Sequence, residues 1–165
     1  RNSKKIINLK SPFIEKAIFE SCKIKKNIVE KDEKEKNLRK ILNFGHTFAH
    51  AYEASLGYSK KLNHGEAVIL GMKTALSFSL KNNLLKKDEY YLINNHITNS
   101  KLPSNIKKFF KTQDLKKIMS FMLKDKKNFS DKISLVLLKK IGSPIINKEY
   151  DKKNLSLFLK KELSN

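Results

Sequence analysis

The chain has 165 residues and a formal net charge of +20, from 36 lysines and arginines against 16 acidic side chains. Hydrophobic residues make up 39% of it and ten are phenylalanines, which excludes a disordered chain and suffices for one domain with a proper core. The single cysteine, Cys22, excludes an intrachain disulfide and a cysteine-type zinc site, and no apolar run is long enough to cross a bilayer. We therefore expect one cytoplasmic domain over residues 1–165.

The positive charge is almost entirely lysine, spread from end to end, and the only arginines are Arg1 and Arg39. Proteins that read DNA bases favour arginine, whose fork matches guanine. An excess of lysine, asparagine and isoleucine is typical of AT-rich codon usage, so the charge by itself does not indicate a nucleic-acid partner. A phosphorylated substrate is compatible with it, and a non-enzymatic basic binding module stays as an alternative.

The first predicted element is a helix over residues 12–31, where apolar side chains recur at helical spacing and Pro12 suits the first turn. At about 100° per residue, Lys25 projects into the middle of the apolar stripe. A lysine in that position either extends its ammonium to solvent or serves a site. Position alone leaves both interpretations open.

A second helix is predicted from about residue 39 through 56, and Gly57 is a plausible stop after it. Residues 58–64 are expected to form a loop. Another apolar helix follows over about 65–80, where small residues such as Gly71 allow close packing.

Three of the four histidines, His46, His50 and His64, fall within 19 residues. His46 and His50 are four residues apart and share one helix face, and His64 opens the next apolar segment. Imidazoles gathered in this way are typical of a transition-metal or phosphate site. The alternative is three unrelated histidines that cap or pack.

The rest of the chain predicts further helices and one hairpin. Helices are expected over 87–98, 113–123 and 151–163, and a strand over 133–138 is followed by a turn at 142–144 and by apolar residues 145–146. His96 shows no partner and is expected at the surface. The predicted fold class is therefore mainly α, a multi-helix domain with a small β-hairpin near residues 133–148.

Several short motifs, taken in order, resemble the 3-dehydroquinate synthase family of sugar-phosphate cyclases. They are Lys25, Arg39, LNFGHTFAHA at 42–51, HGEAV at 64–68, Leu102-Pro103, Asp125-Lys126-Lys127, LVLL at 135–138 and Ile141-Gly142. The resemblance covers nearly the whole chain and implies the C-terminal, mainly helical half of that fold. The family's N-terminal NAD-binding domain is absent, in keeping with the lack of a glycine-rich phosphate loop. The chain is best interpreted as a fragment or an excised domain.

The resemblance implies a metal site for Zn²⁺ or Co²⁺. His46 and His64 would be two of its three protein ligands, and the third, a glutamate, would lie upstream of this chain. Such a site keeps open positions for substrate, as catalytic sites do.

The resemblance also implies a substrate site. Lys25 and Arg39 would hold hydroxyls and a carboxylate, while Asn43, His50 and Lys126 would hold phosphate. His50 would also shuttle protons, and Lys25 would share in the catalytic work.

Each of these roles has a structural alternative. Arg39 could form an ordinary helix ion pair with Glu35, and Asn43 could cap a helix. Lys126 and its neighbour Lys127 could belong to a solvated charge run, and the sequence does not decide between them. Glu66 is expected to favour the helix dipole rather than to bind metal.

The function implied is an NAD- and metal-dependent carbon–oxygen lyase. It would convert 3-deoxy-arabino-heptulosonate 7-phosphate to 3-dehydroquinate and phosphate in the shikimate pathway of aromatic amino acid biosynthesis. NAD would be bound mainly by the missing domain, with no cofactor-binding residue in this chain, so the fragment alone is expected to be inactive. The full enzyme is expected to be a homodimer, with no nucleic-acid or membrane partner. Another sugar-phosphate cyclase or a metal-dependent polyol dehydrogenase of the same architecture is the alternative.

Overall fold

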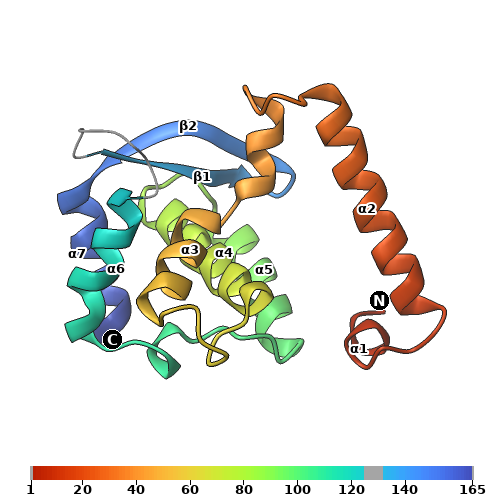
Figure 1. Ribbon diagram of the computed structural model, residues 1–165, viewed down its shortest axis with the longest axis horizontal. Helices are drawn as coiled ribbons and strands as arrows, with labels where there is room; N and C mark the ends of the chain where they lie inside the picture. Colours follow the sequence, from red (N-terminus) through yellow and green to blue (C-terminus); the bar gives the residue numbers. More distant parts are fainter. Residues whose placement is uncertain (1, 125–131, 165) are drawn as a thin grey trace.

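The computed structural model describes residues 2–124 and 132–164, and its helices fall into an arm and a body (Figure 1). The arm consists of α1 (Ser3–Ile7) and α2 (Phe13–Lys31). The 3₁₀ helix η1 (Leu38–Asn43) connects the arm to the body. The body contains α3 (His46–Ser55), α4 (His64–Lys81), α5 (Lys87–Asn99), η2 (Ile106–Lys108), η3 (Thr112–Asp114), α6 (Leu115–Lys124) and α7 (Lys152–Ser164). No helix in the described part of the chain is long and apolar enough to span a membrane.

Two antiparallel strands, β1 (Lys132–Lys140) and β2 (Ser143–Asp151), lie across one side of the body (Figure 1). Ile133, Leu135 and Leu137 alternate along β1 and are buried in the core. The residues between them are half-buried on the other side of the strand, as a period of two requires. Gly142 makes the tight turn with a φ of 78°. The predicted hairpin and the mainly α fold class are confirmed.

The core lies where α3 and α4 pack against each other and against α6, α7 and the inner face of the hairpin. The α3–α4 contact is unusually close because two glycines face each other. A Cβ at Gly45 would lie 2.4 Å from the backbone nitrogen of Met72, and one at Gly71 would lie 2.2 Å from the carbonyl oxygen of Gly45. Only residues without a side chain allow this approach, which fixes the start of α3 against the middle of α4.

The prediction of one helix over 39–56 is wrong, because η1 ends at Asn43 and α3 begins at His46. Gly45 between them has a φ of 82°, a left-handed conformation that interrupts the helix and that glycine adopts easily. The other predicted helices are confirmed, with ends that shift by one or two residues. The short helix α1 was not predicted.

The arm leaves several large apolar side chains of α2 uncovered. No residue of α2 is buried, and this helix packs against α1 and η1. Ile18, Phe19 and Ile24 are 57%, 64% and 58% exposed. The hydrophobic burial that normally stabilises an amphipathic helix is therefore missing along most of α2.

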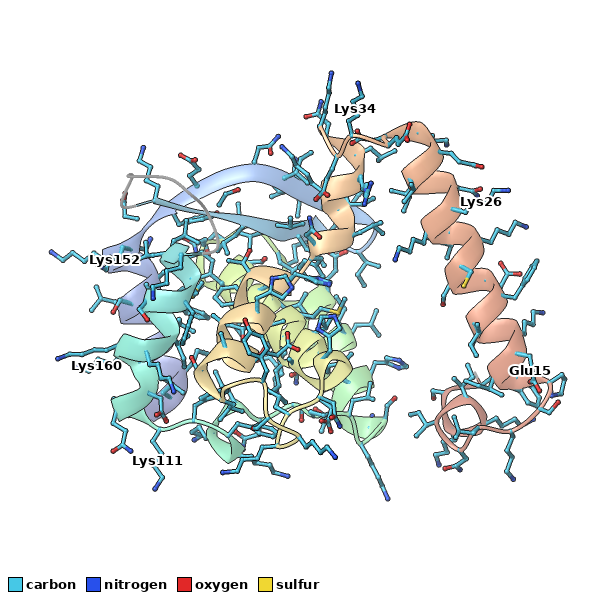
Figure 2. The ribbon with its side chains drawn as sticks, in the orientation of Figure 1. Glu15, Lys26, Lys34, Lys111, Lys152 and Lys160 are labelled. Carbon is cyan, nitrogen blue, oxygen red and sulfur yellow. The ribbon has the colours of Figure 1, made fainter. Side chains whose placement is uncertain are left out.

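Exposed lysines occur on both the arm and the body. Figure 2 shows Lys26 projecting from α2, Lys34 from the turn after it, and Lys111, Lys152 and Lys160 from the body. These side chains point outward from separate parts of the molecule and do not form a single basic stripe of the kind that follows a nucleic-acid backbone.

Candidate functional site

The rings of His46, His50 and His64 gather at the junction of α3 and α4. Their centroids are 5.6 Å apart for His46 and His50, 5.9 Å for His46 and His64, and 6.3 Å for His50 and His64. The first two stand one turn apart on α3, and His64 is the first residue of α4. The structure thus brings together all three histidines of the sequence motif, while His96 is exposed on α5.

Oxygen acceptors orient two of these rings. The Nδ1 atom of His64 lies 3.1 Å from each carboxylate oxygen of Glu53, and Nδ1 of His46 lies 3.4 Å from the carbonyl oxygen of Phe44. An Nδ1 that faces an oxygen acceptor carries the proton, which leaves the lone pair on Nε2. Metal-binding histidines are commonly held in this way by a carboxylate or a backbone carbonyl.

The electrostatic surroundings favour the neutral form of His46. Burial lowers the pKa of His46, the hydrogen bond to Phe44 opposes that shift, and the neighbouring His50 and His64 lower the pKa further. A neutral imidazole is the form that donates its lone pair to a metal. Within residues 2–124 and 132–164, however, no three His, Cys, Asp or Glu side chains are arranged to hold a metal ion. A metal ion bound by these histidines would therefore need a further ligand that does not belong to the described residues.

A cavity of about 330 Å³ opens beside the cluster, between η1, α3 and the hairpin. Most of the residues that line it carry polar side chains; they are Glu35, Lys40, Asn43, His46, Thr47, His50, Ser134, Leu135, Val136 and Asn147. Lys40 donates a hydrogen bond of 2.8 Å to the side-chain oxygen of Asn147, which ties η1 to β2 across the cavity. This arrangement offers amide, hydroxyl, imidazole and ammonium donors to one anionic ligand.

The carboxylate of Glu35 contacts two side chains of η1, those of Asn43 and Arg39. Asn43 donates from Nδ2 to Glu35 at 2.5 Å, and Nε of Arg39 lies 3.9 Å from the same carboxylate. The alternative ion pair between Arg39 and Glu35 is therefore present. Asn43 does not cap a helix through its side chain; it faces the cavity.

The carboxylate of Asp32 fixes the turn that carries these groups. It accepts backbone hydrogen bonds from Lys36, Asn37 and Arg39 at 2.8 to 2.9 Å. The hydrogen bonds from Arg39 and Asn37 lower the pKa of Asp32 most. Asp32 thus sets where η1 starts, and with it the positions of Arg39 and Asn43.

The other candidate residues lie apart from this cavity or outside the described residues. Lys25 is exposed on α2 and does not line the cavity, so the structure does not bring it to the histidines. Arg39 is half-buried on η1 next to the cavity but is not part of its lining. Lys126 and Lys127 lie outside the described residues.

Sequence reasoning assigned no role to Glu53 or to Lys40. Glu53 follows His46 by seven residues and His50 by three, so it shares their face of α3, and this spacing could have indicated it. Its side chain is 13% exposed against His64. The contact of Lys40 with Asn147 joins residues 107 positions apart, and no local pattern reveals it. Glu66 accepts a hydrogen bond of 2.9 Å from the backbone of Asn63 at the start of α4, as a first-turn acid is expected to do.

A family model and the sequences of curated relatives both place this chain in the same family. The family model described as "3-dehydroquinate synthase C-terminal" matches residues 1–128. The 3-dehydroquinate synthase of Pelagibacter ubique is 62% identical over 164 residues, which cover 99% of this chain and 45% of that protein. That of Endomicrobium trichonymphae is 41% identical over 129 residues, 78% of this chain and 34% of the relative. The chain thus spans less than half the length of these relatives.

Solved structures show the same fold at lower identity. A 2-deoxy-scyllo-inosose synthase complexed with carbaglucose-6-phosphate, NAD⁺ and Co²⁺ superimposes with a TM-score of 0.61 and 22% identity over 77% of this chain and 35% of that one. The 2-epi-5-epi-valiolone synthase of Streptomyces hygroscopicus, with NAD⁺ and Zn²⁺ bound, superimposes with a TM-score of 0.64 and 18% identity. The match covers 82% of this chain and 36% of that one. At these identities the likeness shows the fold alone. The match over residues 1–128 and the close Pelagibacter relative show that this chain belongs to the 3-dehydroquinate synthase family, as its C-terminal part.

Proposed function

We propose that this chain is the metal- and substrate-binding part of a cytoplasmic 3-dehydroquinate synthase. The enzyme would convert 3-deoxy-arabino-heptulosonate 7-phosphate to 3-dehydroquinate and phosphate, as a carbon–oxygen lyase of the shikimate pathway. The observation that carries the proposal is the cluster of His46, His50 and His64 beside a polar cavity, built from the motifs of that family. The 62% identity to the Pelagibacter relative favours this activity over that of another cyclase or of a polyol dehydrogenase.

The donor set suits Zn²⁺ or Co²⁺. His46 and His64 each present an Nε2 lone pair, because Nδ1 is held by a backbone carbonyl in one and by Glu53 in the other. The distance between the two rings is compatible with ligands of one ion after small rotations. When bound, the metal would polarise substrate hydroxyls and ease the formation of an alkoxide. The third ligand is proposed to come from the N-terminal part of the enzyme.

The cavity next to the cluster is proposed to hold the phosphate group of the substrate. Asn43 gives one amide hydrogen to Glu35 and retains a second for a phosphate oxygen. His50 and Lys40 line the same cavity and add an imidazole and an ammonium group. Lys126, together with these residues, would complete the phosphate site. A phosphate dianion would pair with the ammonium group of Lys40 and accept hydrogen bonds from the other donors beside it.

His50 is proposed to move protons between substrate and solvent. Its ring lies one helix turn from His46, at the cavity wall, and it is exposed to water. Imidazole can accept and donate a proton at neutral pH, which suits the several proton transfers of this reaction. Arg39 is proposed to hold the substrate carboxylate through its planar guanidinium. Lys25 is proposed to reach a substrate hydroxyl once the whole enzyme positions α2.

The exposed face of the arm is proposed to pack against the N-terminal, NAD-binding part. Ile18, Phe19 and Ile24 lie more than half exposed on α2, and Leu9, beside α1, is 72% exposed. An amphipathic helix is normally stabilised by burial of its apolar stripe, to which Ile18 belongs, so a partner surface is expected along α2. The chain spans 45% of the Pelagibacter relative, so more than half of that enzyme has no counterpart in it. We propose that the chain alone lacks turnover, binds metal weakly and works as a homodimer in the complete enzyme.

The proposal is tested with a chimaera in which this chain replaces the 164 aligned residues of the Pelagibacter ubique enzyme. Phosphate release from the heptulosonate phosphate is followed with NAD⁺ and Zn²⁺ present. We expect turnover within about tenfold of the intact relative, and none from the 165-residue chain alone. A folded chimaera that releases no phosphate would refute the proposed activity. Turnover by the chain alone would refute the proposed division between the two parts.

A further inference from the structure

A second cavity lies between α4, α5, α7 and the segment at 98–107, and none of the clustered histidines lines it. Its volume is about 470 Å³, within the range of small-molecule sites. Three charged side chains from three elements line it: Lys73 of α4, Lys107 of η2 and Glu162 of α7. The cavity therefore brings positive and negative groups together at a place that the proposed reaction does not use.

The two half-buried charges in this cavity do not neutralise each other directly. Lys73 donates one hydrogen bond, to the backbone carbonyl of Ser104 at 2.5 Å, and its ammonium has two further N–H groups. Among the described residues Lys73 and Glu162 form no ion pair, so their charged atoms are more than 4.0 Å apart. Glu162 accepts no hydrogen bond from the described part of the chain. A gap is left between one cation and one anion.

Partial burial makes both charges costly. Burial lowers the pKa of Lys73, and the charge of Glu162 opposes that shift. Burial raises the pKa of Glu162, and the charges of Lys73, Lys161 and Lys81 oppose it. Each charged form would be stabilised by a close partner of opposite sign, since unpaired charges are disfavoured away from water.

We propose that this cavity binds a free α-amino acid, whose carboxylate pairs with Lys73 and Lys107 and whose ammonium group pairs with Glu162. A simple anion would bring negative charge up to Glu162, and a simple cation would face two lysines, so a zwitterion fits best. Ile106 and the ring of Tyr90 line the same cavity, are half-buried, and offer apolar surface to the amino acid side chain. The site uses none of the residues assigned to metal or substrate, so it is independent of the proposed function.

The test is a thermal-shift screen of the 165-residue chain against the twenty amino acids, followed by calorimetric titration of those that raise Tm. Two analogues of each hit are titrated beside it: the N-acetyl derivative, which lacks the cation, and the amide, which lacks the anion. The variants are Lys73→Met and Glu162→Gln. Lys160→Met, an exposed lysine of α7 outside the cavity, is the matched control.

We expect saturable binding of at least one amino acid, with affinity reduced by about 10-fold or more in Lys73→Met and Glu162→Gln, since each loses a hydrogen bond to a charged group. Lys160→Met should bind as the unmodified chain does, and both analogues should bind at least about tenfold more weakly. Lys107→Met changes an exposed side chain and provides a folded variant if Lys73→Met does not fold. The proposal would be overturned if none of the twenty amino acids binds, or if an N-acetyl derivative or an amide binds as well as its parent amino acid. Full affinity in both Glu162→Gln and Lys107→Met would also overturn it.

Discussion

Replacing Gly71 with alanine tests the backbone contact that gathers the histidines. A Cβ at this position would lie 2.2 Å from the carbonyl oxygen of Gly45 and 2.9 Å from the backbone nitrogen of Ala49. Both atoms belong to the backbone, which cannot rotate aside as the end of a flexible side chain can. The start of α3 must therefore move away from α4, and His46 must move with it.

The size of the effect follows from two opposing contributions. Alanine in place of glycine inside a helix contributes up to about 1 kcal/mol to stability. Overpacking a well-packed interior costs about 1–3 kcal/mol, and backbone contacts on two sides place Gly71→Ala at the upper end. We expect the free energy of unfolding to fall by about 2 kcal/mol, which lowers Tm by about 4–8 °C in a chain of this size.

Urea unfolding followed by circular dichroism measures this change, and Gly65→Ala is the matched control in the same helix. Apart from its chain neighbours and the backbone of its own helix, nothing lies within 4 Å of a Cβ at Gly65, so this variant should be as stable as the unmodified chain or more stable by up to about 1 kcal/mol. Equal stability of Gly71→Ala and Gly65→Ala would refute the close α3–α4 contact.

Three further substitutions test the surroundings of the site. Asp32 has a lowered pKa because backbone N–H groups, first those of Arg39 and Asn37, bind its charged form. Ionised Asp32 therefore stabilises the fold above the unfolded-state pKa of about 3.9, and this contribution is lost as pH falls through the lower folded-state pKa. We expect Asp32→Asn to lose less stability on acidification than the unmodified chain does. Glu53→Gln should weaken metal binding by the chimaera about 10–100-fold, because the carboxylate no longer orients His64. Lys40→Met should weaken competitive inhibition of the chimaera by inorganic phosphate about 10-fold or more, because a charged donor is lost.

For each of these substitutions, a comparison protein and a result that contradicts the prediction can be named. Identical pH profiles for Asp32→Asn and the unmodified chain would show that the hydrogen bonds to Asp32 do not stabilise the fold. Glu149→Gln, at an exposed position of β2, should leave metal affinity unchanged, and an equal loss in both glutamate variants would contradict the role of Glu53. Lys60→Met removes an exposed lysine outside the cavity. If it weakens phosphate inhibition as much as Lys40→Met, general charge and not the cavity binds phosphate.

Local patterns in the sequence predict most elements of this fold. The apolar periodicity of residues 65–80 and the strand residues at 133–138 give elements that differ from the structure by a few residues at their ends. Apolar periodicity cannot reveal the break at Gly45, because the stripe continues across it. The break depends on a left-handed φ and on the approach of Gly71, a residue on another helix.

The sequence predicts only those parts of the site whose residues lie on one segment. His46 and His50 share a helix face, so their proximity follows from spacing, and the family resemblance adds His64. The contact that orients His64 comes from tertiary structure, because Glu53 reaches it across a loop, and the contact of Lys40 with Asn147 on the hairpin is tertiary too. The position of Lys25 depends on what covers the apolar face of α2, which no pattern within this chain specifies.

The most direct test of the histidine cluster is the metal content of the purified chimaera, measured by atomic absorption after dialysis against Zn²⁺ and then buffer. We expect one Zn²⁺ per chain in the unmodified chimaera and in His96→Ala, which alters the exposed histidine of α5. His46→Ala and His64→Ala should each lose the metal, because each removes one imidazole from the shared site. Retention of one Zn²⁺ per chain in both variants would contradict a metal site built on His46 and His64.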